Sequence, residues 1–143
     1  GQALIEILKK NPKKIKVIEI SPIFRNHLKN KFGKKIEVYE NDAKNLKGII
    51  NNSSIDKILL INVIYFLNPL ELYLKELKRI LNKDGTIFIA GKFEAVKTFD
   101  DNVFQNKKIT ELLKVLKKFF KVSYEFVDLG DLNSRYYAIY LKK

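Results

Sequence analysis

Polar side chains follow three predicted strands at the point where each strand ends. Glu19 closes the apolar stretch KVIEI, Asp42 follows KIEVYE, and Asn62 ends IDKILLIN. In open α/β sheets, ligands bind outside the carboxyl ends of the strands. A carboxylate at such an end can accept hydrogen bonds from both hydroxyls of a ribose, a second can accept one from an adenine amino group, and an amide can hold a ligand ammonium group. The three residues together indicate a nucleoside site.

Each of these side chains also has a purely structural interpretation. Glu19 could stabilise the positive N-terminal end of the helix that follows it, Asp42 could begin a turn, and Asn62 could simply end its strand. The neighbours of the two acids extend the functional interpretation. Ile20 could lie against the flat face of an adenine, and the Ala43 amide could contact a ring nitrogen. Three polar residues at successive strand ends favour a binding site over three separate structural roles.

Alternating helices and strands would position these residues. Ser21 is a good helix N-cap, Pro22 suits the first helical position, and Gly33 suits the end of that helix. The run at 55–62 is the most hydrophobic, so we expect it to be a central strand. Residues 92–106 carry no pattern and are expected to form a loop or lid. Hydrophobic spacing predicts strands at 14–20, 35–40, 55–62 and 86–91 and helices at 2–11, 22–32, 69–81 and 109–120.

The C-terminal part breaks this alternation. VSYEFVDL and SRYYAIYL are joined only by GDLN, which leaves no room for a helix. Two strands with so short a link must pair antiparallel. The order of elements therefore predicts one α/β domain over residues 1–143. Its sheet would be doubly wound and mostly parallel, with helices on both faces and an antiparallel C-terminal hairpin at one edge.

Composition narrows the range of partners. The net charge is +12, but Arg25, Arg79 and Arg135 are the only arginines, and lysines are spread along the whole chain. Readers of bases and phosphates usually employ arginine, so this basic protein is less suited to nucleic acid than its charge suggests. No apolar run approaches the roughly 20 residues that span a bilayer, so no membrane partner is expected. The absence of cysteine fits a cytoplasmic protein, and no metal-binding motif is present.

The series EISP, NDAKNL, IDKILLINVIYFL and ELKRILNKDGTIFI resembles class I S-adenosylmethionine-dependent methyltransferases, especially the small-molecule branch that includes ubiquinone-biosynthesis enzymes. The resemblance covers nearly the whole chain in the family's order and approximate spacing. Lys83, Asp84 and Gly85 stand where the family has Pro-Gly-Gly before its fifth strand. The C-terminal hairpin is similar to the family's reversed seventh strand. The resemblance implies a Rossmann-like fold and S-adenosyl-L-methionine as cofactor.

The resemblance also assigns roles to residues. Glu19 would hold the ribose, Asp42 and Ala43 the adenine, and Asn62 with Val63 would border the methionine part. The expected cofactor-binding residues are Gly1, Glu19, Ile20, Asp42, Ala43, Asn62 and Val63.

One part of the family pattern has no counterpart. The family's first strand and glycine-rich turn precede the first helix, and Gly1 matches only the last glycine of that turn. In the family, this strand lies between the strands that correspond to 14–20 and 55–62. Without it, each unpaired buried backbone group would cost roughly 1–3 kcal/mol, against a total stability of about 5–15 kcal/mol. The sequence therefore predicts an N-terminally truncated fold. We favour a longer protein as the source of the strand. The alternatives are that a second chain supplies it, or that the strands at 14–20 and 55–62 pair directly in a rearranged sheet.

Methyl transfer from a sulfonium is an in-line displacement that mainly requires positioning and exclusion of water. No catalytic residue can be assigned, because His27 is expected on an outer helix face. Tyr65 could reach an acceptor pocket or belong to the core. INVIYFL lacks the Pro-Pro-Tyr run of the enzymes that methylate amino groups of nucleic acids and proteins, so we expect a small-molecule acceptor.

Three other functions remain open. One is a non-catalytic, methyltransferase-like remnant that acts as a binding or assembly module. Another is an RNA methyltransferase that uses the basic surface. A nicotinamide-dependent dehydrogenase would use the same acid, but the antiparallel hairpin fits methyltransferases better.

Overall fold

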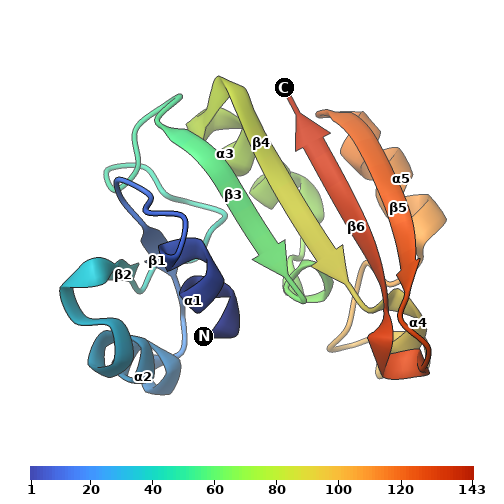
Figure 1. Ribbon diagram of the computed structural model, residues 1–143. Helices are drawn as coiled ribbons and strands as arrows, with labels where there is room; N and C mark the ends of the chain where they lie inside the picture. Colours follow the sequence, from blue (N-terminus) through green and yellow to red (C-terminus); the bar gives the residue numbers. More distant parts are fainter. The chain divides into compact units, whose positions relative to one another are not determined.

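The computed structural model describes residues 1–143, which form two compact units, Gly1–Leu46 and Lys47–Lys143. Each unit contains helices and parallel strands (Figure 1). The elements of the first unit are α1 (Gln2–Leu8), β1 (Lys16–Ile18), α2 (Pro22–Phe32), the 3₁₀ turn η1 (Gly33–Lys35) and β2 (Glu37–Tyr39). Those of the second are β3 (Ile55–Ile61), η2 (Ile64–Phe66), α3 (Leu70–Ile80), β4 (Leu81–Gly91), α4 (Phe93–Val96), α5 (Ile109–Lys117), β5 (Lys121–Asp128), η3 (Leu132–Ser134) and β6 (Arg135–Lys142).

Local sequence signals set the limits of α2 in the first unit. The Ser21 hydroxyl accepts a hydrogen bond from the Phe24 amide at 3.4 Å, and Pro22 is the first helical residue. The helix ends at Gly33, whose φ of 55° lies in the left-handed region that glycine adopts without strain. Both predicted boundaries of this helix are confirmed.

The core of the first unit lies between its helices and its two parallel strands. Val17 of β1 pairs with Val38 of β2. Both pack, with Leu4 and Leu8 of α1, against a buried cluster. That cluster consists of Leu28, Phe32 and Ile36.

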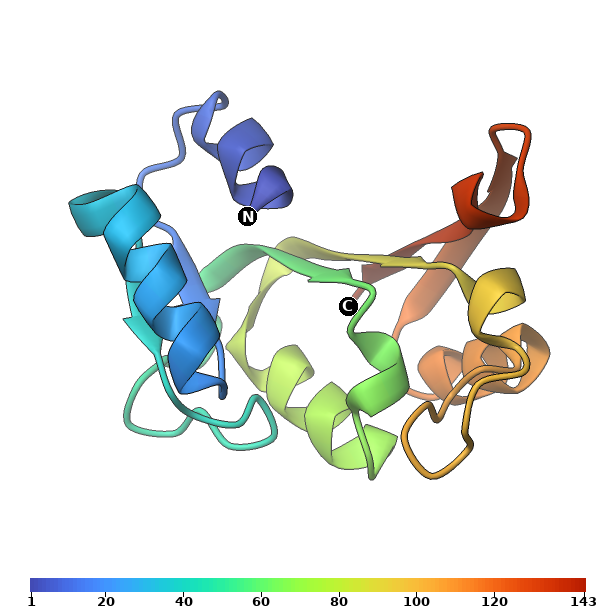
Figure 2. The same cartoon turned by 90° about the horizontal axis from the view of Figure 1, so that it is seen from below.

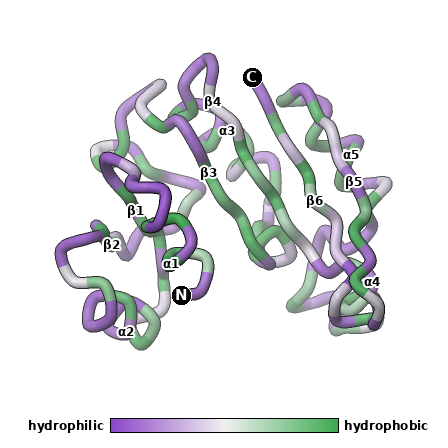
Figure 3. Tube along the Cα trace, in the orientation of Figure 1, coloured by the Kyte–Doolittle hydropathy of each residue, from purple (hydrophilic) through white to green (hydrophobic).

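The second unit is built on a four-stranded sheet in the order β3-β4-β6-β5. β3 and β4 are parallel, whereas β6 runs antiparallel to both β4 and β5. Helices α3 and α5 lie on the same face of this sheet (Figure 2). Apolar residues run along much of β3 and β4 (Figure 3). The α/β class and the C-terminal antiparallel hairpin predicted from the sequence are confirmed, and the sheet is mixed.

The apolar stripe predicted for residues 69–81 forms the buried side of α3. Leu70, Tyr73, Leu74, Leu77 and Ile80 are all buried. None of the helices in the structure is long and apolar enough to cross a membrane.

The predicted turn at 83–85 instead forms a bulge within β4. Ile55 pairs with Leu81 and Lys57 pairs with Thr86, so residues 82–85 lie opposite Asp56 alone. A Cβ on Gly85 would lie 2.6 Å from the Leu81 side chain and 3.0 Å from the Asp56 carbonyl oxygen. The bulge therefore requires glycine at this position.

One expectation about strand order is wrong. The strand predicted to be central, β3, is an edge strand of its sheet, and only β4 pairs with it. The reason is that hydrophobic content does not identify the partners of a strand; in β3, only Leu60 is buried. Residues 92–106, expected to form a loop, include the short helix α4.

Candidate cofactor and acceptor site

In the first unit, Glu19 and Asp42 lie at the same edge of the two-stranded sheet. Glu19 follows β1, and its amide donates a hydrogen bond to the Tyr39 carbonyl oxygen at 3.0 Å. Asp42 comes three residues after β2 ends at Tyr39. Since β1 and β2 are parallel, both acids follow carboxyl ends. Both acids thus lie at the kind of strand end where ligands bind in open α/β sheets, and a nucleoside site here remains a prediction.

Only one oxygen of the Glu19 carboxylate is engaged by the protein. Oε1 accepts a hydrogen bond from the Ser21 amide at 2.9 Å, at the start of α2. This contact is the structural role that the sequence left open. Oε2 makes no hydrogen bond or ion pair with the protein, so it is available to a ligand hydroxyl. The neighbouring Ile20 side chain is 66% exposed.

Arg25 organises this edge, although the sequence did not single it out for a role. Its Nη1 donates to the carbonyl oxygens of Glu19 at 3.0 Å and Ile20 at 2.7 Å. Its Nη2 lies 3.5 Å from the Glu40 carboxylate, just after β2. Arg25 therefore fixes the backbone that carries Glu19 and links it to the end of the neighbouring strand. The only sequence signal was the scarcity of arginine in a lysine-rich chain.

Asp42 begins a turn with a partly exposed carboxylate. Its Oδ1 accepts a hydrogen bond from the Lys44 amide at 3.2 Å, and its carbonyl oxygen accepts one from Asn45 at 3.0 Å. Oδ2 lies 3.8 Å from the Lys44 ammonium. Ala43 is half-buried. Gly1, the remaining predicted residue of this unit, is exposed and immediately precedes α1.

In the second unit, Asn62 and Val63 lie at the carboxyl end of β3. The Asn62 amide donates to the Ala90 carbonyl oxygen at 2.8 Å, which extends the pairing of β3 with β4. Asn62 has a φ of 55°, and asparagine tolerates this left-handed conformation better than most residues. The chain thereby turns from β3 into η2 and leaves the side chains of Asn62 and Val63 exposed.

Tyr65 is buried at the same end of the sheet. Its ring lies 5.4 Å from that of Phe93 and 5.9 Å from that of Phe104, centroid to centroid. Its hydroxyl makes no well-formed hydrogen bond. Burial raises the pKa of Tyr65 to about 12, and the nearby Lys92 amide offsets this only in part. Tyr65 therefore stays neutral near pH 7 and does not serve as a base; its contact with a substrate remains a prediction.

A loop that follows α4 is fastened to η2. The Asn106 side-chain amide donates to the carbonyl oxygens of Ile64 at 2.8 Å and Leu67 at 2.9 Å. The Gln105 amide donates to the Tyr65 carbonyl oxygen at 2.7 Å. The sequence did not reveal this contact, because residues 92–106 have no hydrophobic period and their partners lie about 40 positions away in the chain.

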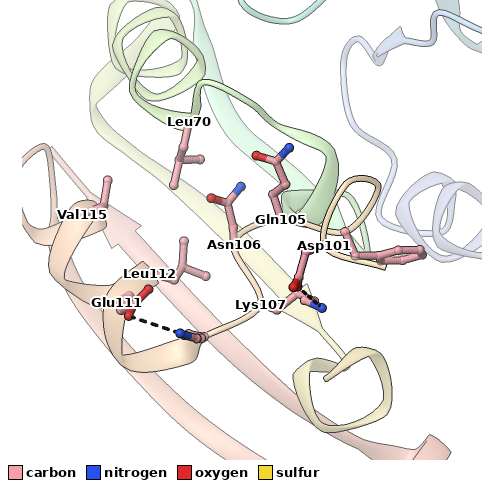
Figure 4. Close-up of a pocket in the computed structure, with 10 residues that line it drawn as sticks. Leu70, Asp101, Gln105, Asn106, Lys107, Glu111, Leu112 and Val115 are labelled. Carbon is pink, nitrogen blue, oxygen red and sulfur yellow. Dashed lines mark ion pairs between the residues drawn. The ribbon is translucent and has the colours of Figure 1, made fainter. Parts of the chain in front are cut away.

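A shallow hollow of about 350 Å³ is lined by residues of this loop, of α3 and of α5 (Figure 4). Leu70, Leu112 and Val115 contribute apolar lining. The charged side chains around it pair with one another, Asp101 with Lys107 at 2.7 Å and Glu111 with Lys108 at 3.8 Å. None of the residues predicted to bind the cofactor lines this hollow, and it is the weaker candidate for a ligand site.

The parallel strands of each unit have polar residues at their carboxyl ends, as in Rossmann-like α/β folds. A family model described as a methyltransferase domain matches residues 1–89. The chain belongs to this family. The predicted resemblance to class I S-adenosylmethionine-dependent methyltransferases is thus confirmed, and with it S-adenosylmethionine as the cofactor of the family.

Solved structures share the fold of this chain. The PH0226 protein from Pyrococcus horikoshii OT3 matches 98% of this chain and 76% of its own, with 19% identity and a TM-score of 0.71. A SAM-dependent methyltransferase from Aquifex aeolicus matches 90% of this chain and 68% of its own, with 20% identity and a TM-score of 0.67. The 1,6-didemethyltoxoflavin-N1-methyltransferase of Burkholderia thailandensis matches 100% and 66%, with 15% identity and a TM-score of 0.71. No curated protein sequence is significantly similar to this chain.

Proposed function

We propose that this chain is an S-adenosylmethionine-dependent methyltransferase domain that methylates a small molecule. The observation that carries the proposal is the pair of acids at one edge of the β1–β2 sheet. Glu19 keeps Oε2 free of protein partners, and Asp42 follows the neighbouring parallel strand. An unpaired carboxylate oxygen at a strand end suits a ribose hydroxyl.

The cofactor residues would act as follows. Glu19 would accept hydrogen bonds from the ribose, the exposed Ile20 would lie against the adenine, and Asp42 with the Ala43 amide would bind the adenine edge. Asn62 and Val63 would border the methionine part, and Gly1 would lie near its carboxylate. Arg25 would act as a positioning residue, because it binds the carbonyl oxygens on both sides of the Glu19–Ile20 peptide unit.

Bound S-adenosylmethionine supplies a methyl group already activated by its sulfonium. The chain then has to orient the acceptor for in-line attack and exclude water. Tyr65, the ionisable residue closest in sequence to the predicted methionine site, is held neutral by burial. We therefore expect no proton transfer to Tyr65 during methyl transfer.

Two observations favour a small-molecule acceptor over RNA. One of the structural neighbours is a 1,6-didemethyltoxoflavin-N1-methyltransferase with that compound and S-adenosylhomocysteine bound. In addition, all three arginines have protein partners: Arg25 binds carbonyl oxygens, Arg79 pairs with Glu76, and Arg135 lies 3.2 Å from an Asp128 oxygen. Only Arg135 keeps both terminal guanidinium nitrogens free of protein partners, so the arginines offer little for bidentate contacts with phosphates.

Calorimetric titration with S-adenosylhomocysteine tests the proposed function. We expect binding to the full chain, and roughly 10- to 100-fold weaker binding by Glu19→Gln, because a charge-assisted hydrogen bond contributes about 1.5–3 kcal/mol. Glutamine can still accept the Ser21 hydrogen bond, so the local fold should persist. Glu6→Gln, which changes an exposed acid of α1 paired with Lys9, is the matched control.

The absence of both binding heat and thermal stabilisation would refute the proposal and favour a non-catalytic remnant. RNA binding that weakens steeply with salt would instead support an RNA methyltransferase.

We also infer that a further parallel strand pairs with the free edge of β3, supplied by a longer protein or by a second chain. Supporting this, β3 is an apolar edge strand whose Leu59 and Ile61 side chains are exposed. Such a strand would complete one domain over residues 1–143. Hydrogen exchange combined with light scattering tests this inference. If the chain is monomeric, the β3 amides that point away from β4 should exchange rapidly. Slow exchange of every β3 amide in a monomer would contradict the inference.

A further inference from the structure

Three phenylalanine rings form a contiguous group at the carboxyl end of β3, which we call the aromatic platform. Phe66 comes from η2, whereas Phe99 and Phe104 come from the loop after α4. The Phe104 ring lies 5.0 Å from the Phe66 ring and 5.0 Å from the Phe99 ring, centroid to centroid. Phe66 and Phe99 are 50% and 47% exposed, respectively. The platform thus presents two large apolar rings to solvent.

This platform is held in place by the protein beneath it. The buried ring of Tyr65 contacts Phe66 at 6.1 Å and Phe104 at 5.9 Å. Asn106 and Gln105 fasten the loop to η2 through three hydrogen bonds. The rings are therefore ordered before any ligand binds, which lowers the entropic cost of binding.

Three charged side chains of the loop, Asp100, Asp101 and Lys107, make their contacts within the loop itself. The Lys107 ammonium donates to the carbonyl oxygens of Lys97 and Phe99 and pairs with Asp101 at 2.7 Å. The Asp100 carboxylate accepts a hydrogen bond from the Asn102 amide at 2.9 Å. These groups stabilise the loop, and no lysine or arginine makes a cation–π contact with Phe66, Phe99 or Phe104. Such a surface suits an uncharged ligand.

The position of the platform connects it with the predicted cofactor site. Phe66 lies three residues after Val63, and its amide donates to the Val63 carbonyl oxygen at 3.0 Å. Asn62 and Val63 are the residues expected to border the methionine part of the cofactor, from which the methyl group leaves. The platform therefore directly follows the residues closest to the expected reacting centre.

We propose that the aromatic platform binds the methyl acceptor, and that this acceptor is a flat, uncharged aromatic molecule. This inference rests on the proposed methyltransferase function. Flat rings gain offset-stacked or edge-to-face contacts with phenylalanine that a saturated ring of similar size does not gain. The exposed faces of Phe66 and Phe99 would supply these contacts.

The experiment compares two probes, 2-naphthol and its saturated analogue decahydro-2-naphthol, by ligand-observed NMR titration of the full chain. We expect 2-naphthol to bind at least about threefold more tightly than the saturated alcohol, in line with the contribution of one aromatic pair. Phe66→Leu and Phe99→Leu should each weaken 2-naphthol binding by a similar factor. Leucine preserves apolar area, so these variants test the flat ring rather than general hydrophobicity.

Phe126→Leu is the matched control, because Phe126 lies on β5 and is also 47% exposed. It should bind 2-naphthol like the unchanged protein. Circular dichroism should show that all three variants are folded. If a leucine variant does not fold, intermolecular NOEs from 2-naphthol to the Phe66 and Phe99 rings of the unchanged protein provide the same test.

Equal binding of the two probes, or full 2-naphthol affinity in both platform variants, would overturn the inference. A change of oligomeric state in Phe66→Leu, seen by light scattering, would also overturn it and identify the platform as an interface between chains. Failure of S-adenosylhomocysteine to bind the unchanged protein would contradict the proposed function, whereas failure of 2-naphthol alone would contradict only this inference.

Discussion

Replacing Asn106 with alanine should release the loop of residues 97–108 from η2. The Asn106 side chain donates hydrogen bonds to the carbonyl oxygens of Ile64 at 2.8 Å and Leu67 at 2.9 Å, and alanine cannot donate them. Asn106 also has a φ of 56°, a left-handed conformation that asparagine tolerates better than alanine. The variant should therefore lose both a side-chain contact and a backbone preference.

The two effects can be given magnitudes and separated. Two hydrogen bonds at about 0.5–1.5 kcal/mol each contribute about 1–3 kcal/mol, and the left-handed backbone adds about 1 kcal/mol for alanine. Asn106→Ala should thus destabilise the closed loop by about 2–4 kcal/mol. Asn106→Gly removes the hydrogen bonds but adopts the left-handed backbone freely, so it should lose only about 1–3 kcal/mol.

Hydrogen exchange at the Gln105 amide measures this opening, because that amide donates to the Tyr65 carbonyl oxygen at 2.7 Å. A loss of about 2–4 kcal/mol should accelerate its exchange by roughly 30- to 700-fold. Asn102→Ala is the control, since Asn102 lies in the same loop and its side chain makes no hydrogen bond with the protein. An unchanged exchange rate of the Gln105 amide in Asn106→Ala, or an equal acceleration in Asn102→Ala, would refute this prediction.

Two further predictions concern each unit separately. The Tyr39 hydroxyl, with Lys14 and Lys16, lowers the pKa of Glu37 from 4.5 to about 2. Because the pKa is lower in the folded than in the unfolded protein, ionised Glu37 stabilises the fold above pH 4.5. This stabilisation is lost as the pH falls towards 2. The difference in urea midpoint between the unchanged protein and Glu37→Gln should shrink over that range, and a constant difference would contradict this. Gly91→Ala would place a Cβ 2.5 Å from the Phe93 ring and 2.9 Å from the Tyr65 hydroxyl, so overpacking should lower stability by about 1–3 kcal/mol; an unchanged melting temperature would refute this.

The elements that sequence predicts well are those whose signals are local. α2 follows from Ser21, Pro22 and Gly33, which lie at its two ends, and α3 follows from an apolar stripe with helical spacing. The antiparallel hairpin follows from the shortness of its link. In each case the deciding interaction joins residues that are close in the chain.

The features that sequence did not predict depend on distant partners. The bulge at 82–85 exists because the register between β3 and β4 shifts opposite Asp56. Arg25 and Asn106 are polar residues without a distinctive pattern, and their roles depend on which carbonyl oxygens the fold brings near them. Hydrophobic content could not show that β3 is an edge strand, because the apolar character of side chains does not report hydrogen bonding of the backbone.

The predicted cofactor residues divide between the units, with Glu19 and Asp42 in the first and Asn62 and Val63 in the second. Asn62 and Val63 follow β3, which has a free edge because it pairs only with β4. If a further strand pairs with this edge, it would hold the end of β3, and with it Asn62 and Val63, before the cofactor binds. Strand pairing and cofactor binding would then be linked, so each must raise the affinity of the other by the same factor. A completed sheet should therefore bind S-adenosylhomocysteine more tightly than the chain alone, and a strand that pairs without changing this affinity would show that the two processes are independent.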